Sequence, residues 1–220
     1  MNELAKELIK GAEVIGIKLS KAMIEKFNTY REELLVWNKK MNLISMGDES
    51  RIVKRHFLDS LNATKFIPPN ASVLDVGSGA GFPGVPIKIV REDIKLDLLE
   101  PKFKRCDFLN HLVNVLSLEI GVYMSRVENF SGKYDVILSR AVGKLKWLTK
   151  VATPLLATDG RVITYKGTEF WTEFYAMDMR KELNRWEVES RERRKFCGGT
   201  IVVLKKVSRL LPSENKCTIH

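Results

Sequence analysis

The stretch that decides the fold runs from Val73 to Gly84 and reads Val-Leu-Asp-Val-Gly-Ser-Gly-Ala-Gly-Phe-Pro-Gly. It has the pattern of a short buried strand, a glycine-rich turn and the start of a helix. Four glycines fall within eight positions, whereas an ordinary turn needs only one. Glycine allows positive φ and the close approach of a ligand, and a helix N-terminus presents unpaired N–H groups. The stretch therefore predicts a loop that binds a polar small-molecule cofactor.

The composition is that of a soluble globular protein, with 220 residues, 45% of them hydrophobic and 29% charged. This length suits one domain with an extension. No apolar run approaches a membrane span, and the N-terminus lacks the pattern of a secretion signal. Cys106, Cys197 and Cys217 are widely spaced and have no histidine partners, which predicts reduced thiols and neither a disulfide framework nor a metal site. We therefore expect a cytoplasmic protein that does not bind membranes.

The net charge of +10 is the second informative property of the chain. A basic excess favours an anionic partner, most often a nucleic acid, and an attraction that weakens with salt. Ordinary surface lysines produce the same excess, so charge alone leaves both interpretations open.

The order of apolar patterns predicts three segments of the chain. Residues 1–66 have helical spacing, with Ser20 as an N-cap and a third helix from about Ser50, and they predict a helical extension. Residues 67–207 alternate strand-like and helical runs, which predicts parallel strands joined by crossover helices, and 208–220 read as a polar tail. Strands are expected at 72–76, 95–99, 119–123, 134–138, 161–165, 185–190 and 200–206, and helices at about 83–91, 102–116, 144–156 and 168–183.

Two cofactor classes use a strand, a glycine loop and a helix in this way, namely dinucleotides and S-adenosyl-L-methionine. The spacing Gly79-x-Gly-x-x-Gly matches the dinucleotide pattern, but such a match alone is weak. With Gly77 as the first glycine, the third dinucleotide glycine falls on Phe82, which is incompatible with close helix–strand packing. The remaining pattern, Asp75-x-Gly-x-Gly-x-Gly, resembles the first motif of class I methyltransferases. A carboxylate there suits a cofactor with a cationic amino-acid moiety, so S-adenosyl-L-methionine is favoured.

Acidic residues at the ends of the next two strands support a nucleoside ligand. Glu100 ends the second strand about twenty residues beyond the loop, where a carboxylate can accept hydrogen bonds from both ribose hydroxyls. Both cofactor classes share this feature, and a surface acid is the alternative. Arg126-Val127-Glu128 follows the third strand, where residues that contact adenine usually lie in this fold.

Four segments together resemble the RsmG (GidB) family, bacterial methyltransferases that modify N7 of a guanine in 16S ribosomal RNA. They are Trp37–Leu43, Arg55–Leu61, the glycine loop with its Phe-Pro-Gly continuation, and Ser139-Arg140-Ala141. The resemblance runs from about residue 30 to 167, and the Phe-Pro-Gly continuation is its most specific part. It implies a class I methyltransferase fold, which is a Rossmann-like, mostly parallel seven-stranded sheet with helices on both faces. It also implies 16S ribosomal RNA or the small ribosomal subunit as partner, and we expect a monomer.

The resemblance also assigns cofactor contacts by position. Position 127 usually holds alanine in this family, so valine is expected to narrow the adenine side slightly. With the acid and the second glycine of the loop included, the expected cofactor-binding residues are Asp75, Gly77, Gly79, Phe82, Glu100, Pro101, Lys102, Val127, Glu128 and Arg140.

Methylation at guanine N7 sets modest demands on the protein. N7 already carries an in-plane lone pair, so the enzyme needs chiefly proximity and in-line alignment. Arg140, at the end of the fourth strand, is the expected catalytic residue, because it can orient guanine or the cofactor carboxylate. A structural salt bridge is the alternative for Arg140. An acceptor near the guanine would stabilise the positive charge that builds on it, but the sequence does not identify one.

Six residues are candidates for RNA binding, and each has a structural alternative. A histidine beside apolar residues is most often a packing residue, and a basic run is as often a solvated hairpin tip. The candidates are His56, Lys166, Arg191, Arg193, Arg194 and Lys195. A methyltransferase acting on another nucleic acid or a small molecule, and a non-catalytic RNA-binding protein on the same fold, are the alternative functions.

Overall fold

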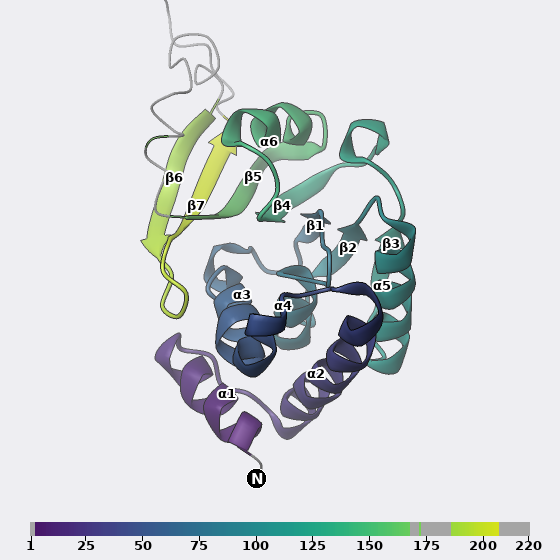
Figure 1. The fold of residues 1–220 in the computed structure, drawn as a ribbon. Helices are drawn as coiled ribbons and strands as arrows, with labels where there is room; N and C mark the ends of the chain where they lie inside the picture. Colours follow the sequence, from purple (N-terminus) through teal and green to yellow (C-terminus); the bar gives the residue numbers. More distant parts are fainter. Residues whose placement is uncertain (1–2, 168–171, 173–185, 207–220) are drawn as a thin grey trace, which may run out of the picture.

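A seven-stranded sheet divides the molecule, with helices on both of its faces (Figure 1). The structure is a computed structural model, which describes residues 3–167, 172 and 186–206. The strand order is β3-β2-β1-β4-β5-β7-β6. The strands are β1 (Ser72–Val76), β2 (Lys95–Leu99), β3 (Ile120–Tyr123), β4 (Tyr134–Arg140), β5 (Leu156–Lys166), β6 (Trp186–Arg193) and β7 (Thr200–Lys206).

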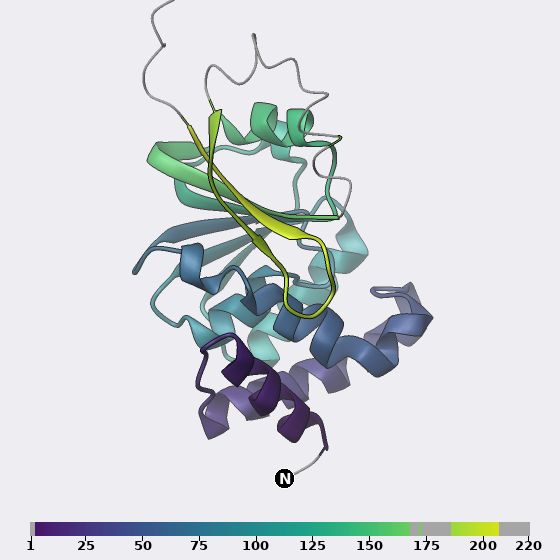
Figure 2. The ribbon, with the colours of Figure 1, turned by 90° about the vertical axis from the view of Figure 1, so that its left-hand side faces the viewer.

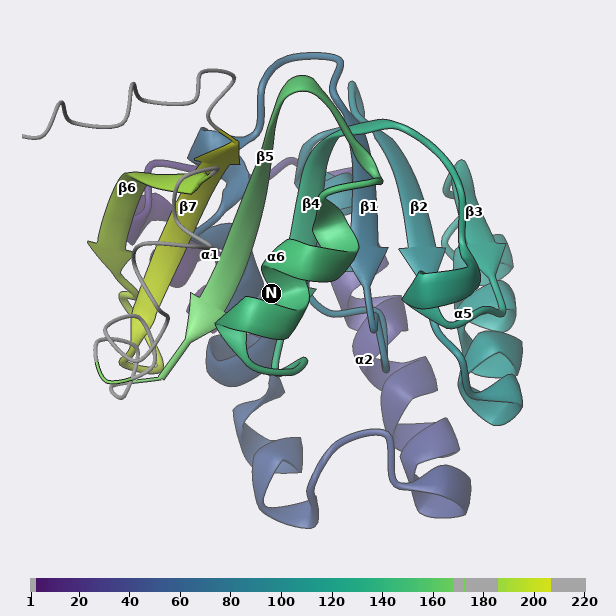
Figure 3. The same cartoon turned by 90° about the horizontal axis from the view of Figure 1, so that it is seen from above.

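Most of the sheet is parallel. β1 to β5 pair in parallel, and β7 runs antiparallel to both β5 and β6 (Figure 3). The predicted mostly parallel seven-stranded sheet is confirmed. Strand order reverses between β1 and β4, and ligands of open α/β sheets bind at the carboxyl ends of strands beside such a reversal. The glycine loop follows β1 directly and therefore lies at that position.

Alternate residues of the central strands pack into two separate hydrophobic cores, one on each face of the sheet. Val136, Leu138 and Ile163 pack with the helices α1 to α5, whereas Ile137 and Val162 pack with α6. This alternation is what a strand buried on both faces requires. The helices are α1 (Glu3–Val14), α2 (Lys21–Met41), α3 (Asp59–Leu61), α4 (Gly84–Val90), α5 (Phe103–Val115) and α6 (Leu145–Ala152).

The N-terminal extension packs against the same face of the sheet as α4 and α5 and reaches the glycine loop (Figure 1). Ser20 caps α2 as expected, because its side chain accepts a hydrogen bond from the Met23 N–H. Phe27, Tyr30 and Leu34 form the buried face of α2. The Tyr30 hydroxyl donates to the Ala80 carbonyl at 2.6 Å, so the extension supports the loop directly.

The helix expected from Ser50 is instead a series of short turns. A 3₁₀ helix (Met46–Arg51) is followed by a π-helical turn (Val53–Leu58) and then by α3. π-helical turns are rare and occur frequently at functional sites. This one carries His56, whose carbonyl accepts the Ser60 hydroxyl at 2.5 Å.

Two further expectations about the C-terminal half need revision. α6 ends at Ala152 and β5 begins at Leu156, so the helix expected over 144–156 is too long and the strand over 161–165 too short. An irregularity in the β4–β5 pairing between Tyr134 and Val136 accommodates the extra residues of β5. The expected helix at 168–183, apart from Thr172, and the tail at 208–220 lie outside the described residues. Among the described helices, none is long and apolar enough to cross a membrane.

The β6–β7 hairpin connects the far edge of the sheet to the N-terminal extension (Figure 2). At its tip the Lys195 N–H donates to the Asn62 side chain at 3.2 Å. An ion pair joins Lys65 to Glu192 nearby. The hairpin tip therefore lies over the same helical segment that carries His56.

Candidate active site

The glycine loop after β1 has a conformation that only glycine adopts readily. Gly77 and Gly79 have φ of +73° and +59°, in the left-handed region. A Cβ on Gly77 would lie 2.6 Å from Val142 Cγ2, so a side chain there would also require Val142 or the loop to shift. The Gly77 N–H donates to the Leu99 carbonyl at 2.8 Å, which ties the loop to the end of β2.

Glu100 joins the two strand ends through its carboxylate. The side chain is only 2% exposed, and its Oε2 accepts the Gly79 N–H at 3.0 Å. Its Oε1 accepts the Lys102 N–H at 3.0 Å, and Arg105 lies 3.7 Å away. Each carboxylate oxygen has a second lone pair, so the group can also accept ribose hydroxyls. Pro101 and Lys102 follow it and are exposed, beside the same strand end.

Asp75 lies beneath the loop rather than on an open surface. Its side chain is fully buried, and Oδ2 accepts the Gly84 N–H at the start of α4 at 2.9 Å. Burial raises the pKa of this carboxyl to about 7, although the Gly84 hydrogen bond and the Arg140 charge oppose the rise. The sequence pattern predicted direct contact between Asp75 and the cofactor. In the structure the side chain holds the loop against the helix that follows, and its contact with the cofactor stays a prediction.

The segment after β3 carries the two residues that the sequence predicts beside adenine. Val127 is 8% exposed and begins a short 3₁₀ turn (Val127–Asn129). The Glu128 carboxylate accepts the Trp147 indole N–H of α6 at 3.1 Å. The two residues expected to contact adenine therefore lie together, between the end of β3 and α6.

Phe82 connects the glycine loop to a second set of residues. Its ring stacks on His56, with centroids 4.8 Å apart and planes 19° apart. Tyr30 stacks on the same ring at 5.4 Å, and the Arg140 guanidinium lies over it at 4.9 Å. Phe82 is 4% exposed, so the residue that is most specific to the sequence motif is an internal link and not a surface contact.

A cavity of about 370 Å³ opens beside this stack. Its lining comes from four segments that are distant in sequence, at 48–59, 140–141, 165–167 and 194–197. The carboxyl ends of β4 and β5 form one side, and the π-helical turn and the hairpin tip form the other. Ala141 takes a φ of 58°, which is uncommon outside glycine and marks the sharp turn that follows Arg140.

Charged side chains converge on Asp59 inside this cavity. Arg194 Nη1 donates to Asp59 Oδ2 at 2.7 Å, and Arg140 Nη1 lies 3.6 Å from the same oxygen. Burial raises the pKa of the Asp59 carboxyl, and the charges of Arg194 and Arg140 oppose that rise. The salt bridge considered for Arg140 is therefore present, and Arg140 lines the cavity at the same time.

His56 is held neutral beside this cluster. Arg140 Nη2 donates to His56 Nδ1 at 3.1 Å, which assigns the imidazole proton to Nε2. Burial, followed by the Arg140 charge, lowers the pKa of His56 to about 4. Asp48 lies 3.8 Å from Nε2, beyond hydrogen-bond distance.

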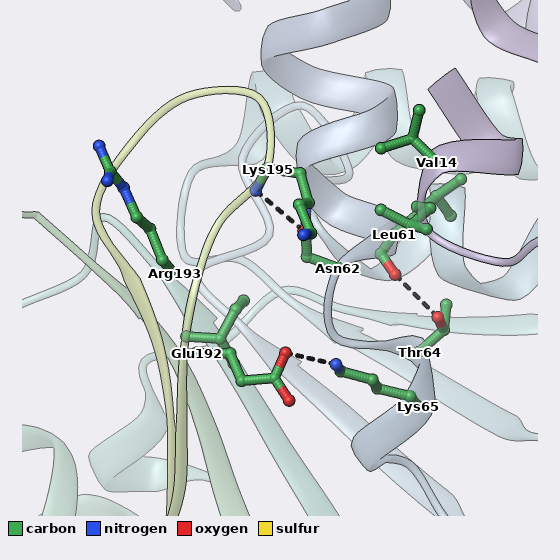
Figure 4. Close-up of a pocket in the computed structure, with 10 residues that line it drawn as sticks. Val14, Leu61, Asn62, Thr64, Lys65, Glu192, Arg193 and Lys195 are labelled. Carbon is green, nitrogen blue, oxygen red and sulfur yellow. Dashed lines mark hydrogen bonds and ion pairs between the residues drawn. The ribbon is translucent and has the colours of Figure 1, made fainter. Parts of the chain in front are cut away.

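The structure separates the candidate RNA-binding residues into two groups. His56, Lys166 and Arg194 line the cavity, and Lys166 donates to the Gly143 carbonyl at 3.3 Å. Arg193 and Lys195 line a different cavity of about 180 Å³ between the hairpin, α1 and α3, where Arg193 extends away from the helices (Figure 4). Exposed Arg191 lies further along β6.

Several residues that line the main cavity were not predicted as site residues from the sequence, and three of them carry side chains that bear on its chemistry. These three are Asp59, Tyr165 and Cys197. Asp59 lies within the quoted Arg55–Leu61 motif, one helical turn after His56, and that spacing was the available signal. Tyr165 and Cys197 carry no comparable local signal, since only the sheet and the hairpin bring them here.

Comparison with known families agrees with this geometry. The family model for rRNA small subunit methyltransferase G (GidB) matches residues 23–196. The chain belongs to this family. It is therefore a methyltransferase of small-subunit ribosomal RNA, as the sequence resemblance implied.

Individual relatives cover most of the chain. Ribosomal RNA small subunit methyltransferase G of Caldanaerobacter subterraneus subsp. tengcongensis is 38% identical over 220 residues, which is 94% of this chain and 91% of the relative. The protein of the same description from Roseiflexus sp. (strain RS-1) is 39% identical over 174 residues, covering 76% and 74%. A solved SAM-dependent methyltransferase from Aquifex aeolicus superposes with a TM-score of 0.57 at 18% identity, covering 73% of this chain and 94% of that one, and it shows the shared fold.

Proposed function

We propose that this methyltransferase transfers a methyl group from S-adenosyl-L-methionine to N7 of a guanine in 16S ribosomal RNA. One observation carries the proposal. Phe82 belongs to the glycine loop and at the same time stacks on His56 and lies under Arg140, so one ring joins the two halves of the site. A base in the His56–Arg140 cavity would thus lie next to the mouth of the loop, as direct transfer requires.

The residues around the loop fit S-adenosyl-L-methionine. Gly77 and Gly79 give a backbone that a ligand can approach closely, and the Glu100 carboxylate has lone pairs for two ribose hydroxyls. Val127 and Glu128, which follow β3, are the proposed adenine contacts. When bound, the cofactor supplies an activated methyl group, so the chain need only orient it.

The cavity suits a base that needs no deprotonation. Guanine N7 attacks with its own lone pair, so no general base is required, and the neutral His56 next to Arg140 is consistent with this. Arg140 is the proposed orienting residue, because its guanidinium reaches the Phe82 ring, His56 and Asp59 together. Arg55 and Lys166 add positive charge at the cavity, which suits the RNA backbone.

Methyl transfer onto small ribosomal subunits tests the proposal. Subunits from a strain that lacks this protein are incubated with labelled cofactor, and the modified base is mapped. We expect label at N7 of one guanine of 16S ribosomal RNA, and none with the Gly77→Asp variant. Label on another base, on a protein or on transfer RNA would overturn the proposal.

A further inference from the structure

The acceptor cavity contains buried polar atoms that have no partner within the protein. Among the described residues, His56 Nε2 and Asp59 Oδ1 are buried and lack a hydrogen bond. The Asp59 side chain is 2% exposed, and besides Arg194 and Arg140 the weakly donating Cys197 thiol lies beside its carboxylate. Leaving such groups unpaired is unfavourable, so native proteins rarely keep them without a reason.

These two atoms belong to residues that both line the cavity, and they have opposite hydrogen-bonding character. His56 and Asp59 lie three residues apart on one helical segment, and the Arg140 guanidinium touches both. His56 Nδ1 accepts a hydrogen bond from Arg140, so the imidazole proton is on the unpartnered Nε2, which is a donor. Arg194 and Arg140 both lie against Asp59 Oδ2, so the unpartnered Oδ1 is an acceptor. One donor and one acceptor, on two residues that line the cavity, are thus left without a partner.

That pair is complementary to one edge of guanine. Guanine places the acceptor O6 beside the donor N1–H, whereas adenine places the donor N6–H₂ beside the acceptor N1. We propose that His56 Nε2–H donates to guanine O6 and that Asp59 Oδ1 accepts guanine N1–H in place of the Cys197 thiol. This inference rests on the proposed function, because it names the residues that select the base at the same site.

The same contact assists the chemistry. As the N7–CH₃ bond forms and the sulfur–CH₃ bond breaks, the positive charge moves from sulfur to the purine. The charge spreads over the ring and makes N1–H a stronger donor, while the proton remains on N1. The hydrogen bond from guanine N1–H to the fixed Asp59 carboxylate is therefore stronger in the transition state than in the ground state, which lowers the barrier to methyl transfer. Asp59 is the acceptor that the sequence alone did not identify.

Rates on two acceptor bases test the assignment of Asp59. Small subunits carrying guanine or adenine at the mapped position are compared in single-turnover methyl transfer with the native enzyme, Asp59→Asn and Arg194→Gln. Asparagine can donate to adenine N1, so Asp59→Asn is expected to lower the guanine-to-adenine rate ratio by roughly 10-fold or more. Arg194→Gln removes the same ion pair but keeps the carboxylate, so its ratio is expected to equal the native one. An unchanged ratio in Asp59→Asn would reduce the residue to a structural role.

A second test measures nucleotide binding to the native enzyme, so its outcome does not depend on whether a variant folds. Nuclear magnetic resonance follows the His56 imidazole during titration with 7-methylguanosine monophosphate, guanosine monophosphate or adenosine monophosphate. We expect the methylated nucleotide to bind most tightly and adenosine monophosphate roughly 10-fold or more weakly. His111, paired with Glu33 at 2.6 Å, serves as the internal reference and is expected not to shift. Equal binding of all three nucleotides would contradict the inference, whereas the proposed function fails only if the mapped label is not on guanine N7.

Discussion

The two halves of the active site differ in how their polar groups are satisfied. In the cofactor half, both oxygens of Glu100 already accept backbone N–H groups, and the Gly77 N–H is bonded to the end of β2. In the acceptor half, His56, Asp59 and Arg194 each retain a buried atom without a partner among the described residues. In the cofactor half one buried atom, Asp75 Oδ1, lacks a partner. More of the unpartnered buried atoms of the described residues therefore belong to the acceptor half, where we expect the choice of base to be made.

The two halves also differ in how they are assembled. The cofactor loop is built from consecutive residues between β1 and α4, and Glu100 follows on the neighbouring strand. The acceptor cavity takes residues from the extension, two strand ends and the hairpin tip. Substitutions in the first half should therefore act chiefly on cofactor binding, and those in the second on stability, base selection or RNA affinity.

Gly77→Asp is expected to have the largest effect. Residue 77 has a φ of +73°, and a new Cβ would meet Val142 Cγ2 at 2.6 Å, so Val142 or the loop must shift away from the binding conformation. We expect S-adenosyl-L-methionine affinity to fall by about 100-fold or more in isothermal titration calorimetry, since the added strain and the lost contacts are together worth about 3 kcal/mol.

A glycine elsewhere provides the control for this variant. A Cβ added to Gly47 would have no atom within 4 Å, so Gly47→Ala is expected to bind the cofactor with native affinity. Circular dichroism checks that both variants remain folded. Native cofactor affinity in folded Gly77→Asp would show that the loop is not the binding site.

Glu100→Gln is expected to have the next largest effect. The amide keeps the size of the side chain but removes the charged carboxylate, which accepts the Gly79 N–H and is proposed to accept the ribose hydroxyls. Hydrogen bonds to a charged group contribute about 1.5–3 kcal/mol, so we expect cofactor affinity to fall roughly 10- to 100-fold. Exposed Glu119 supplies the matched variant Glu119→Gln, for which the calorimetric affinity is expected to remain native. Equal affinities for the two variants would remove Glu100 from the site.

The contrast between local and dispersed assembly explains what the sequence could predict. The loop conformation, the position of Glu100 and the mostly parallel sheet follow from short patterns, and the structure agrees with them. Asp59 could not be assigned, because its role depends on Arg140 and Arg194, which lie about 80 and 135 residues further along the chain. The strand content of residues 156–160 was missed for a similar reason, since it depends on pairing with β4 rather than on local pattern.

The two halves are expected to respond to pH with opposite signs. His56 has a pKa of about 4 in the folded chain against 6.5 when unfolded, so the unfolded state binds the extra proton as pH falls below 6.5. The free energy of unfolding is therefore expected to fall by about 2 kcal/mol through His56 as the pH is lowered from 7 to 5. Asp75 has a folded pKa of about 7 against 3.8, so its contribution instead declines as pH rises from about 4 to 7.

Urea unfolding at pH 5, 6 and 7 separates these contributions. The stability difference between the native chain and His56→Gln is expected to shrink as pH falls. The difference for Asp75→Asn is expected to grow as pH falls, because the protonated native carboxyl is then favoured. Parallel pH profiles for the two variants would show that neither burial shift operates.

The smallest effect is expected at the hairpin, where neighbouring arginines face different surroundings. Arg193 is exposed and extends away from the helices (Figure 4). Arg194 is half-buried and pairs with Asp59. Arg193→Gln should therefore leave the melting temperature unchanged and weaken RNA binding a few-fold, with the slope of log affinity against log salt reduced by about 1. Arg194→Gln leaves Asp59 without its 2.7 Å partner, so it should lower the melting temperature. Binding to small subunits across a salt series, together with thermal unfolding, checks both variants. An unchanged salt slope in Arg193→Gln would assign this residue to solvated surface and leave the cavity cations as the RNA-binding charges.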